Sequence, residues 1–210
     1  MDPTAALRLA LDPSGILEAQ DITPDPWQRD LLASSGKQVL LNCSRQSGKS
    51  TVVSALALHT ALFQPGSLTL LLCLAQRQSG ELFRKVMHAY NAMKRPLPTV
   101  GETQLKMELT NGSRIICLPG REETIRSFSS VALLVIDEAS RVPDDLYRSV
   151  RPMLAVSPWP AHRSIHALRS TGLVLEGMDG RARLGQDQDP LEAVSAHNQR
   201  LHPQRTALAR

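Results

Sequence analysis

The chain has 210 residues, of which 42% are hydrophobic and 3% aromatic, with a formal net charge of +4 and a pI near 9.2. This length suits one α/β domain with a short appendage and leaves little room for a second domain. No apolar run is long enough to span a bilayer and no signal peptide opens the chain, so we expect a cytoplasmic protein without a membrane segment. The basic balance permits contact with nucleic acid without requiring it. The three cysteines lack C-x-x-C spacing, which predicts buried free thiols.

The first 24 residues predict a short helix followed by a loop, with no sign of chemistry. A second helix begins near Pro26, with Asp25 before it as an N-cap and the proline in its first turn. Gln28 lies about twenty residues before a phosphate-binding motif, and an exposed glutamine there could accept from N6 and donate to N7 of an adenine. The alternative is that Trp27 and Gln28 only begin a helix anchored by the indole.

The segment 43–50 has the sequence Cys-Ser-Arg-Gln-Ser-Gly-Lys-Ser and lies between an apolar run and an apolar helical pattern. A strand, a tight loop and a helix in this order are typical of a phosphate-binding loop, although Cys43 stands where the general motif has glycine. Lys49 would reach the β- and γ-phosphates, and Ser50 would ligate Mg²⁺. The predicted nucleotide-binding residues of the loop are Ser44, Arg45, Gln46, Ser47, Gly48, Lys49, Ser50 and Thr51.

The middle of the chain predicts alternating strands and helices. Residues 67–74 form an unbroken apolar run typical of a parallel strand buried on both faces. Residues 76–93 follow with apolar residues at helical spacing. The segment 104–118 predicts a β-hairpin that projects from the sheet, with Asn111-Gly112 as a type I′ turn.

A further apolar strand, 131–136, runs directly into two carboxylates, Asp137 and Glu138. Asp137 at the end of the strand can hold the Mg²⁺ water shell, and Glu138 can orient and deprotonate an attacking water. Taken alone, this pattern also fits a strand followed by a solvated acidic turn. The phosphate loop favours the catalytic interpretation, because both motifs lie where strands end, at the edge where α/β sheets bind ligands.

These motifs resemble the ATPase domain of the large subunit of tailed-bacteriophage or prophage terminases, and the resemblance covers about residues 20–158. A phosphate loop without its first glycine is ordinary in that family. Four segments carry the resemblance: 26–28 (Pro-Trp-Gln), 44–50 (Ser-Arg-Gln-Ser-Gly-Lys-Ser), 75–83 (Ala-Gln-Arg-Gln-Ser-Gly-Glu-Leu-Phe) and 133–147 (Leu-Leu-Val-Ile-Asp-Glu-Ala-Ser-Arg-Val-Pro-Asp-Asp-Leu-Tyr).

The resemblance implies an α/β P-loop NTPase fold of the RecA/ASCE type, with a mostly parallel sheet flanked by helices and a β-hairpin insertion. It implies ATP and Mg²⁺ as cofactors, adenine recognition by Gln28, and contact of Arg45 with the γ-phosphate. It places an arginine finger at Arg126, with Arg121 as a rival. The implied partners are double-stranded DNA, a homo-oligomeric ring, the portal and a small terminase subunit, in a bacterial host cell.

The last fifty residues depart from the family, which would continue with a Gly-Arg strand, a Ser-Thr-Pro motif and a nuclease domain. Degenerate back-translation, read one nucleotide further on, gives such a continuation, so we expect a frameshift near residues 157–159. The expected organisation is an N-terminal segment 1–24, an incomplete ATPase domain 25–158 and an irregular tail 159–210. The strand that follows Asp137 would be absent or replaced, and the sheet edge left exposed would lower stability.

Three functions remain open at this stage. The first is a terminase ATPase, and the second is a helicase motor with an Asp-Glu-x-x box, which would need a second motor domain. The third is an inactive remnant that at most binds nucleotide.

Overall fold

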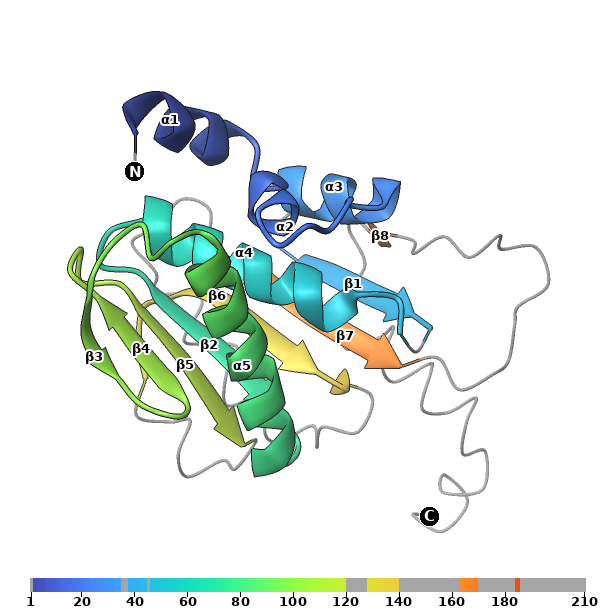
Figure 1. The fold of residues 1–210 in the computed structure, drawn as a ribbon. Helices are drawn as coiled ribbons and strands as arrows, with labels where there is room; N and C mark the ends of the chain where they lie inside the picture. The colour runs from blue at the N-terminus through green and yellow to red at the C-terminus, as the bar shows by residue number, and fades with distance from the viewer. Residues whose placement is uncertain are drawn as a thin grey trace, which may run out of the picture.

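The computed structural model describes residues 2–34, 38–44, 46–119, 128–139, 163–169 and 184–185 (Figure 1). The helices in these ranges are α1 (Pro3–Leu11), α2 (Gly15–Glu18), α3 (Pro26–Ala33), α4 (Lys49–Phe63) and α5 (Gln76–Ala92). The strands are β1 (Gln38–Cys43), β2 (Leu68–Cys73), β3 (Thr99–Glu102), β4 (Lys106–Leu109), β5 (Arg114–Pro119), β6 (Val131–Asp137), β7 (Arg163–Arg169) and β8 (Leu184–Gly185).

The strands form one mixed sheet in the order β3-β4-β5-β2-β6-β7-β1-β8. The five central strands, from β5 to β1, are parallel, and the pairs at both edges are antiparallel. The predicted α/β class with a mostly parallel sheet is therefore confirmed. Parallel strands bring their carboxyl ends to one edge, so β1 and β6 deliver the phosphate loop and Asp137 to the same side of the sheet.

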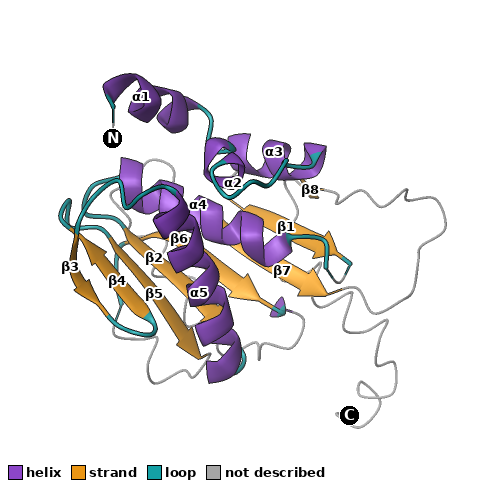
Figure 2. Ribbon diagram, viewed as in Figure 1, coloured by secondary structure: helices purple, strands orange, loops and turns teal. Residues whose placement is uncertain are grey.

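Helices α4 and α5 pack side by side on one face of this sheet (Figure 2). Helix α4 is almost wholly buried, because it is apolar nearly all round and lies between the sheet, α5 and the N-terminal helices. Helix α5 is amphipathic and buries a single stripe of residues that includes Leu82, Phe83 and Val86. Both helices begin just after a strand ends, so their N-termini lie at the carboxyl edge of the sheet.

The N-terminal segment packs on the same core as the sheet. Leu9 of α1 and Ile16 and Leu17 of α2 are buried in the cluster that contains α4 and α5 residues. Arg29 on α3 donates to the Ser14 hydroxyl and pairs with Glu18, and these contacts tie α3 to α2. The boundaries at residues 24/25 and 158/159 stay predictions from the sequence.

The segment 104–118 forms the predicted antiparallel pair, β4 and β5, but it differs from expectation in two ways. It does not project, because β5 pairs in parallel with β2 and so belongs to the main sheet. The turn is not type I′, since Gly112 has a positive φ (+80°) and Asn111 does not. The Asn111 side chain instead donates to the carbonyl of Ala61 at 2.8 Å, near the end of α4. The tertiary contact with α4 therefore selects the turn conformation.

The position between β6 and β1 is filled by β7, which pairs in parallel with both neighbours. The prediction of an exposed edge at this position is therefore wrong for the described part of the sheet. The lowered stability that we expected from such an edge has no support there. We expected residues 163–169 to be irregular because their sequence has weak periodicity. Two flanking strands nevertheless offer backbone donors and acceptors on both sides, and the segment contains neither glycine nor proline.

All three cysteines are free and buried, as predicted. Burial raises the pKa of the Cys73 thiol to about 12, with a further upward contribution from the charge of Asp137. Burial also raises the pKa of Cys43 and of Cys117. Neutral thiols are therefore held away from water and from reaction.

We expect iodoacetamide at pH 8 to label no cysteine of the native protein and all three in denaturant, where the pKa of a thiol is about 8.5. Because the folded pKa values are raised, the stability gained from the neutral thiols is complete below about pH 8 and declines as the pH rises toward 12. Mass spectrometry of the labelled protein checks this. Rapid labelling of native Cys43 or Cys73 would contradict the burial of the strand ends.

Candidate active site

The loop between β1 and α4 has the backbone of an anion-binding site. Gln46 and Gly48 both adopt left-handed φ values, +62° and +82°. Left-handed residues in a short loop turn successive N–H groups toward a common point. Gly48 is also the N-cap of α4, so the first N–H groups of that helix face the same point and its dipole favours negative charge.

Lys49 and Asp137 meet although they lie far apart in the sequence. Lys49 Nζ lies 3.2 Å from Asp137 Oδ1, and the two side chains are only 12% and 21% exposed. Lys49 is the first residue of α4, and Asp137 is the last residue of β6. The structure thus brings the phosphate loop and the acidic motif to one point at the carboxyl edge of the sheet.

Glu138 follows directly and is buried, with 3% of its surface exposed. Its φ of +54° lies in the left-handed region, where a side chain other than glycine costs about 1 kcal/mol or more. Its N–H donates to Asp137 Oδ1 at 3.1 Å. Lys49 and the Glu138 backbone therefore both contact one carboxylate oxygen, which fixes the sharp turn after β6.

Gln28 reaches the phosphate loop from α3, but it is buried and not exposed as we expected from the sequence. Its Oε1 accepts from the N–H of Asp25 at 3.0 Å, which caps α3. Its Nε2 donates to the carbonyl of Ser47 at 3.4 Å. The amide therefore links the start of α3 to the loop, and Trp27 packs partly buried beside it. No sequence pattern signals this contact, because it joins two segments through a backbone carbonyl.

A side chain at position 48 would meet Gln28. A Cβ built on Gly48 would lie 2.6 Å from Gln28 Nε2, and the φ of +82° already disfavours any other residue. We expect Gly48→Ala to lower the free energy of unfolding by about 1–2 kcal/mol from backbone strain alone and to weaken nucleotide binding.

The contribution of Gln28 is separable by a double-mutant cycle. In the Gln28→Ala background, Gly48→Ala should cost less stability, because the clash is gone and only the strain remains. Thermal unfolding of the four proteins measures the difference. Strictly additive losses would show that the loop relaxes away from Gln28.

Helix α5 also touches the first turn of α4. Lys85 Nζ donates to the Thr51 hydroxyl at 3.4 Å, and Thr51 lies two residues after Lys49. No local pattern singles out Lys85, because the contact joins two helices through residues that are 34 positions apart in the sequence. This hydrogen bond places a second lysine beside helix α4, which follows the phosphate loop.

A scan of the chain for protein families matches residues 40–150 to the model described as terminase large subunit, T4-like-virus type, N-terminal. The match spans more than half of the chain. The chain belongs to this terminase large-subunit family.

Solved terminase structures share the fold. The ATPase domain of the large terminase of Thermus phage P74-26 superposes with a TM-score of 0.65 at 18% identity, covering 94% of each chain. The large terminase of bacteriophage HK97 gives 0.59 at 15% identity, over 70% of this chain and 33% of that one. The large terminase of a thermophilic bacteriophage, in complex with ADP, gives 0.53 at 14% identity, over 69% and 39%. The chain thus spans about a third of the HK97 protein and most of the P74-26 domain.

Most of the predicted site residues lie in the described ranges, but three arginines do not. Arg45, Arg126 and the rival Arg121 fall outside the described residues, so their roles stay predictions. Ser44 lies exposed at the end of β1, and Ser50 and Thr51 are half-buried in the first turn of α4. Ser50 is thus on the helix whose first residue pairs with Asp137.

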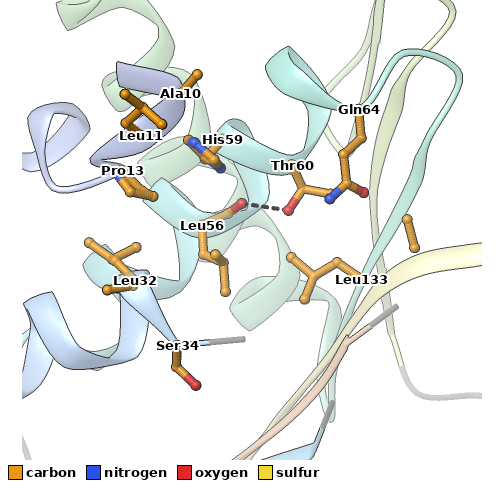
Figure 3. A pocket seen from close by; sticks show the side chains of 12 residues that line it. Ala10, Leu11, Pro13, Leu32, Ser34, Leu56, His59, Thr60, Gln64 and Leu133 are labelled. Atoms are coloured by element: carbon orange, nitrogen blue, oxygen red, sulfur yellow. Dashed lines mark hydrogen bonds between the residues drawn. The ribbon is translucent and has the colours of Figure 1, made fainter. Parts of the chain in front are cut away.

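A separate cavity of about 240 Å³ lies at the other edge of the sheet, among α1, α3, α4 and the start of β6 (Figure 3). Its lining includes Leu11, Leu56 and Leu133 and no Asp, Glu, Lys or Arg side chain of the described residues. The Thr60 hydroxyl within it donates to the carbonyl of Leu56. Without a charged group it does not suit a triphosphate, which favours the site at Lys49 as the place for a nucleotide.

No helix in the described part of the chain is both long and apolar enough to cross a membrane.

Proposed function

We propose that this chain is the ATP-binding and ATP-hydrolysing motor domain of a viral DNA-packaging terminase large subunit. The observation that carries the proposal is the 3.2 Å ion pair between Lys49 and Asp137, which joins the phosphate loop to the acidic motif. The left-handed backbone of the loop and the helix that begins at Lys49 supply the neighbouring anion site. These are the parts that phosphoryl transfer requires.

Each side chain has a distinct task in this proposal. Lys49 holds the β- and γ-phosphates and offsets the charge that develops on the transferred group. Glu138, buried and next to Asp137, orients a water molecule and accepts its proton as the water oxygen attacks the γ-phosphorus. The bond from the γ-phosphorus to its bridging oxygen breaks, and ADP and inorganic phosphate form. Gln28 supports the loop through Ser47, and its proposed role of reading adenine would require this buried amide to turn from Asp25 and Ser47 toward the nucleotide.

The residues present fit Mg²⁺. Ser50 and Asp137 offer hard oxygen ligands, and Mg²⁺ commonly takes one or two protein ligands while keeping waters and phosphate oxygens. The described residues contain no group of three His, Cys, Asp or Glu side chains that could hold a metal ion without a nucleotide. We therefore propose that Ser50 and Asp137 hold the ion only together with the triphosphate. When bound, the ion would neutralise part of the negative charge of the triphosphate.

The same proposal extends to the partners. A terminase motor would act on duplex DNA, with neighbouring subunits of a ring and Arg126 supplying charge to the transition state, and with a portal and a small subunit as further partners. An inactive remnant is the second candidate, since the last fifty residues depart from the family pattern in sequence. The frameshift near residues 157–159 stays a prediction that sequencing the coding DNA tests.

Phosphate release by the purified protein separates the two candidates. We expect ATP hydrolysis with Mg²⁺ that is abolished by EDTA and restored by an excess of Mg²⁺. The control is ATP binding in the same buffer, followed by a fluorescent ATP analogue. Binding without any Mg²⁺-dependent phosphate release would leave a remnant and contradict the motor.

A further inference from the structure

The exposed side of α5, with the turn that follows it, carries a basic face that we define as Arg77, Arg84, Lys85, Lys94 and Arg95. All five residues are exposed, whereas Leu82, Phe83, Val86 and Tyr90 on the other side of the helix are buried. Arg77 and Arg84 are two helical turns apart, so they lie almost in line along the helix, about 10 Å from each other. His88 extends the same row by one turn.

The charges on this face do not cancel. Residues 76–95 contain five Lys or Arg residues and one acidic residue, Glu81. Glu81 pairs with Arg84, and Glu102 lies 3.7 Å from Arg95, so two carboxylates offset part of the charge. These ion pairs are at least one-third exposed at both partners and contribute little stability, which leaves the arginines available to a polyanion.

The composition of the face selects the kind of partner. Phe83 and Tyr90 are buried, and the exposed side of α5 carries no Phe, Tyr or Trp on which unstacked bases could rest. Single-stranded nucleic acid is typically bound through such aromatic platforms. A row of cations without them suits the sugar-phosphate backbone of a duplex, which is bound mainly through charge and without regard to sequence.

The basic face also adjoins the nucleotide site. Lys85 belongs to it and donates to Thr51, in the first turn of the helix that begins at Lys49. Lys85 therefore connects the basic face with the helix that begins at Lys49.

We propose that the basic face of α5 binds the phosphate backbone of duplex DNA independently of base sequence. The choice of DNA as the polyanion rests on the proposed packaging function, whereas the location of the surface rests on the residues of α5. A motor that moves along DNA of any sequence needs such a contact.

The test is fluorescence anisotropy with a labelled duplex of about 30 base pairs and arbitrary sequence, at low salt and without nucleotide. We expect Arg77→Gln with Arg84→Gln to weaken binding about tenfold or more and to reduce the salt dependence of log K by about two units of slope. The matched control is Arg8→Gln with Lys106→Gln, which removes the same charge. Arg8 is exposed on α1, and Lys106 alternates with buried Met107, so it lies on the face of the sheet opposite α5.

The outcomes are distinct. The proposal would be overturned if both double variants weakened binding equally, or if neither weakened it. It would also be overturned if the wild-type protein did not bind the duplex, whether or not it bound an acidic protein instead. Arg77→Lys with Arg84→Lys keeps the charge and should bind like the wild type, with an unchanged melting temperature in all variants. Phosphate release is measured on the same preparations. If the variants bind DNA as predicted but the wild-type protein releases no phosphate, only the motor function is refuted. If the wild-type protein releases phosphate but Arg77→Gln with Arg84→Gln binds DNA normally, only the basic face is refuted.

Discussion

Replacing Lys49 with alanine is expected to lower ATP turnover by about a hundredfold or more and to weaken ATP binding. Among the described residues, its side chain supplies the one ion pair with Asp137, and the same charge would stabilise the phosphates. Loss of a single donor to developing charge typically costs this much in rate. Steady-state phosphate release and equilibrium binding of an ATP analogue measure both effects.

A matched control exists elsewhere in the chain. Lys106 also pairs with a carboxylate, that of Glu108, at 3.2 Å, but its side chain is 43% exposed on β4 and far from the loop in the sequence. Lys106→Ala should leave turnover and binding unchanged. If the two alanine variants behave alike, Lys49 has no role beyond an ion pair.

Glu138→Gln is expected to reduce turnover by about 10²- to 10⁴-fold while ATP binding is retained. Glutamine has nearly the same shape, so it fits a position that is 3% exposed, but it cannot accept the proton of the attacking water. Single-turnover phosphate release, beside binding of the same analogue, separates the two quantities. The exposed Glu81 on α5 serves as control, and Glu81→Gln should have wild-type turnover.

The two variants therefore predict different patterns. Lys49→Ala impairs binding and rate together, and Glu138→Gln impairs the rate alone. A Glu138→Gln protein that binds no ATP would show that the carboxylate is structural, and one with normal turnover would remove it from the reaction.

Those parts of the fold in which local pattern and tertiary environment agree were predictable from the sequence. Strand β2 is apolar nearly throughout and is buried throughout, and α5 has apolar residues at helical spacing and buries that stripe. The phosphate loop was predicted because its glycine, lysine and serine follow a strand and open a helix. In that loop the residues that the backbone conformation requires are next to the residues that would contact phosphate, so one short motif indicates both.

The failures arise where distant contacts decide the outcome. Strand β7 has weak periodicity of its own, and its neighbours β6 and β1 supply the hydrogen-bonding partners. The Asn111 turn follows its contact with the end of α4, which overrides the local preference of Asn-Gly. Strand β3 went unpredicted because it is a short, mostly exposed edge strand with little apolar pattern.

The site shows the same division. The location of Lys49, Ser50, Asp137 and Glu138 at one edge follows from motif and topology, since parallel strands bring their carboxyl ends to that edge. The burial of Gln28 and the contact of Lys85 with Thr51 depend on how helices pack, and no local pattern encodes them. The left-handed φ of Glu138 was equally invisible in the sequence, and this strain is consistent with the role proposed for Glu138.

The most direct measurement is a crystal structure of the protein with Mg²⁺ and a non-hydrolysable ATP analogue. We predict that Lys49 Nζ lies within hydrogen-bonding distance of the β- and γ-phosphate oxygens, and that one Mg²⁺ lies between the Ser50 hydroxyl and the Asp137 carboxylate. A nucleotide bound elsewhere, with the ion pair between Lys49 and Asp137 left as it is, would contradict the account.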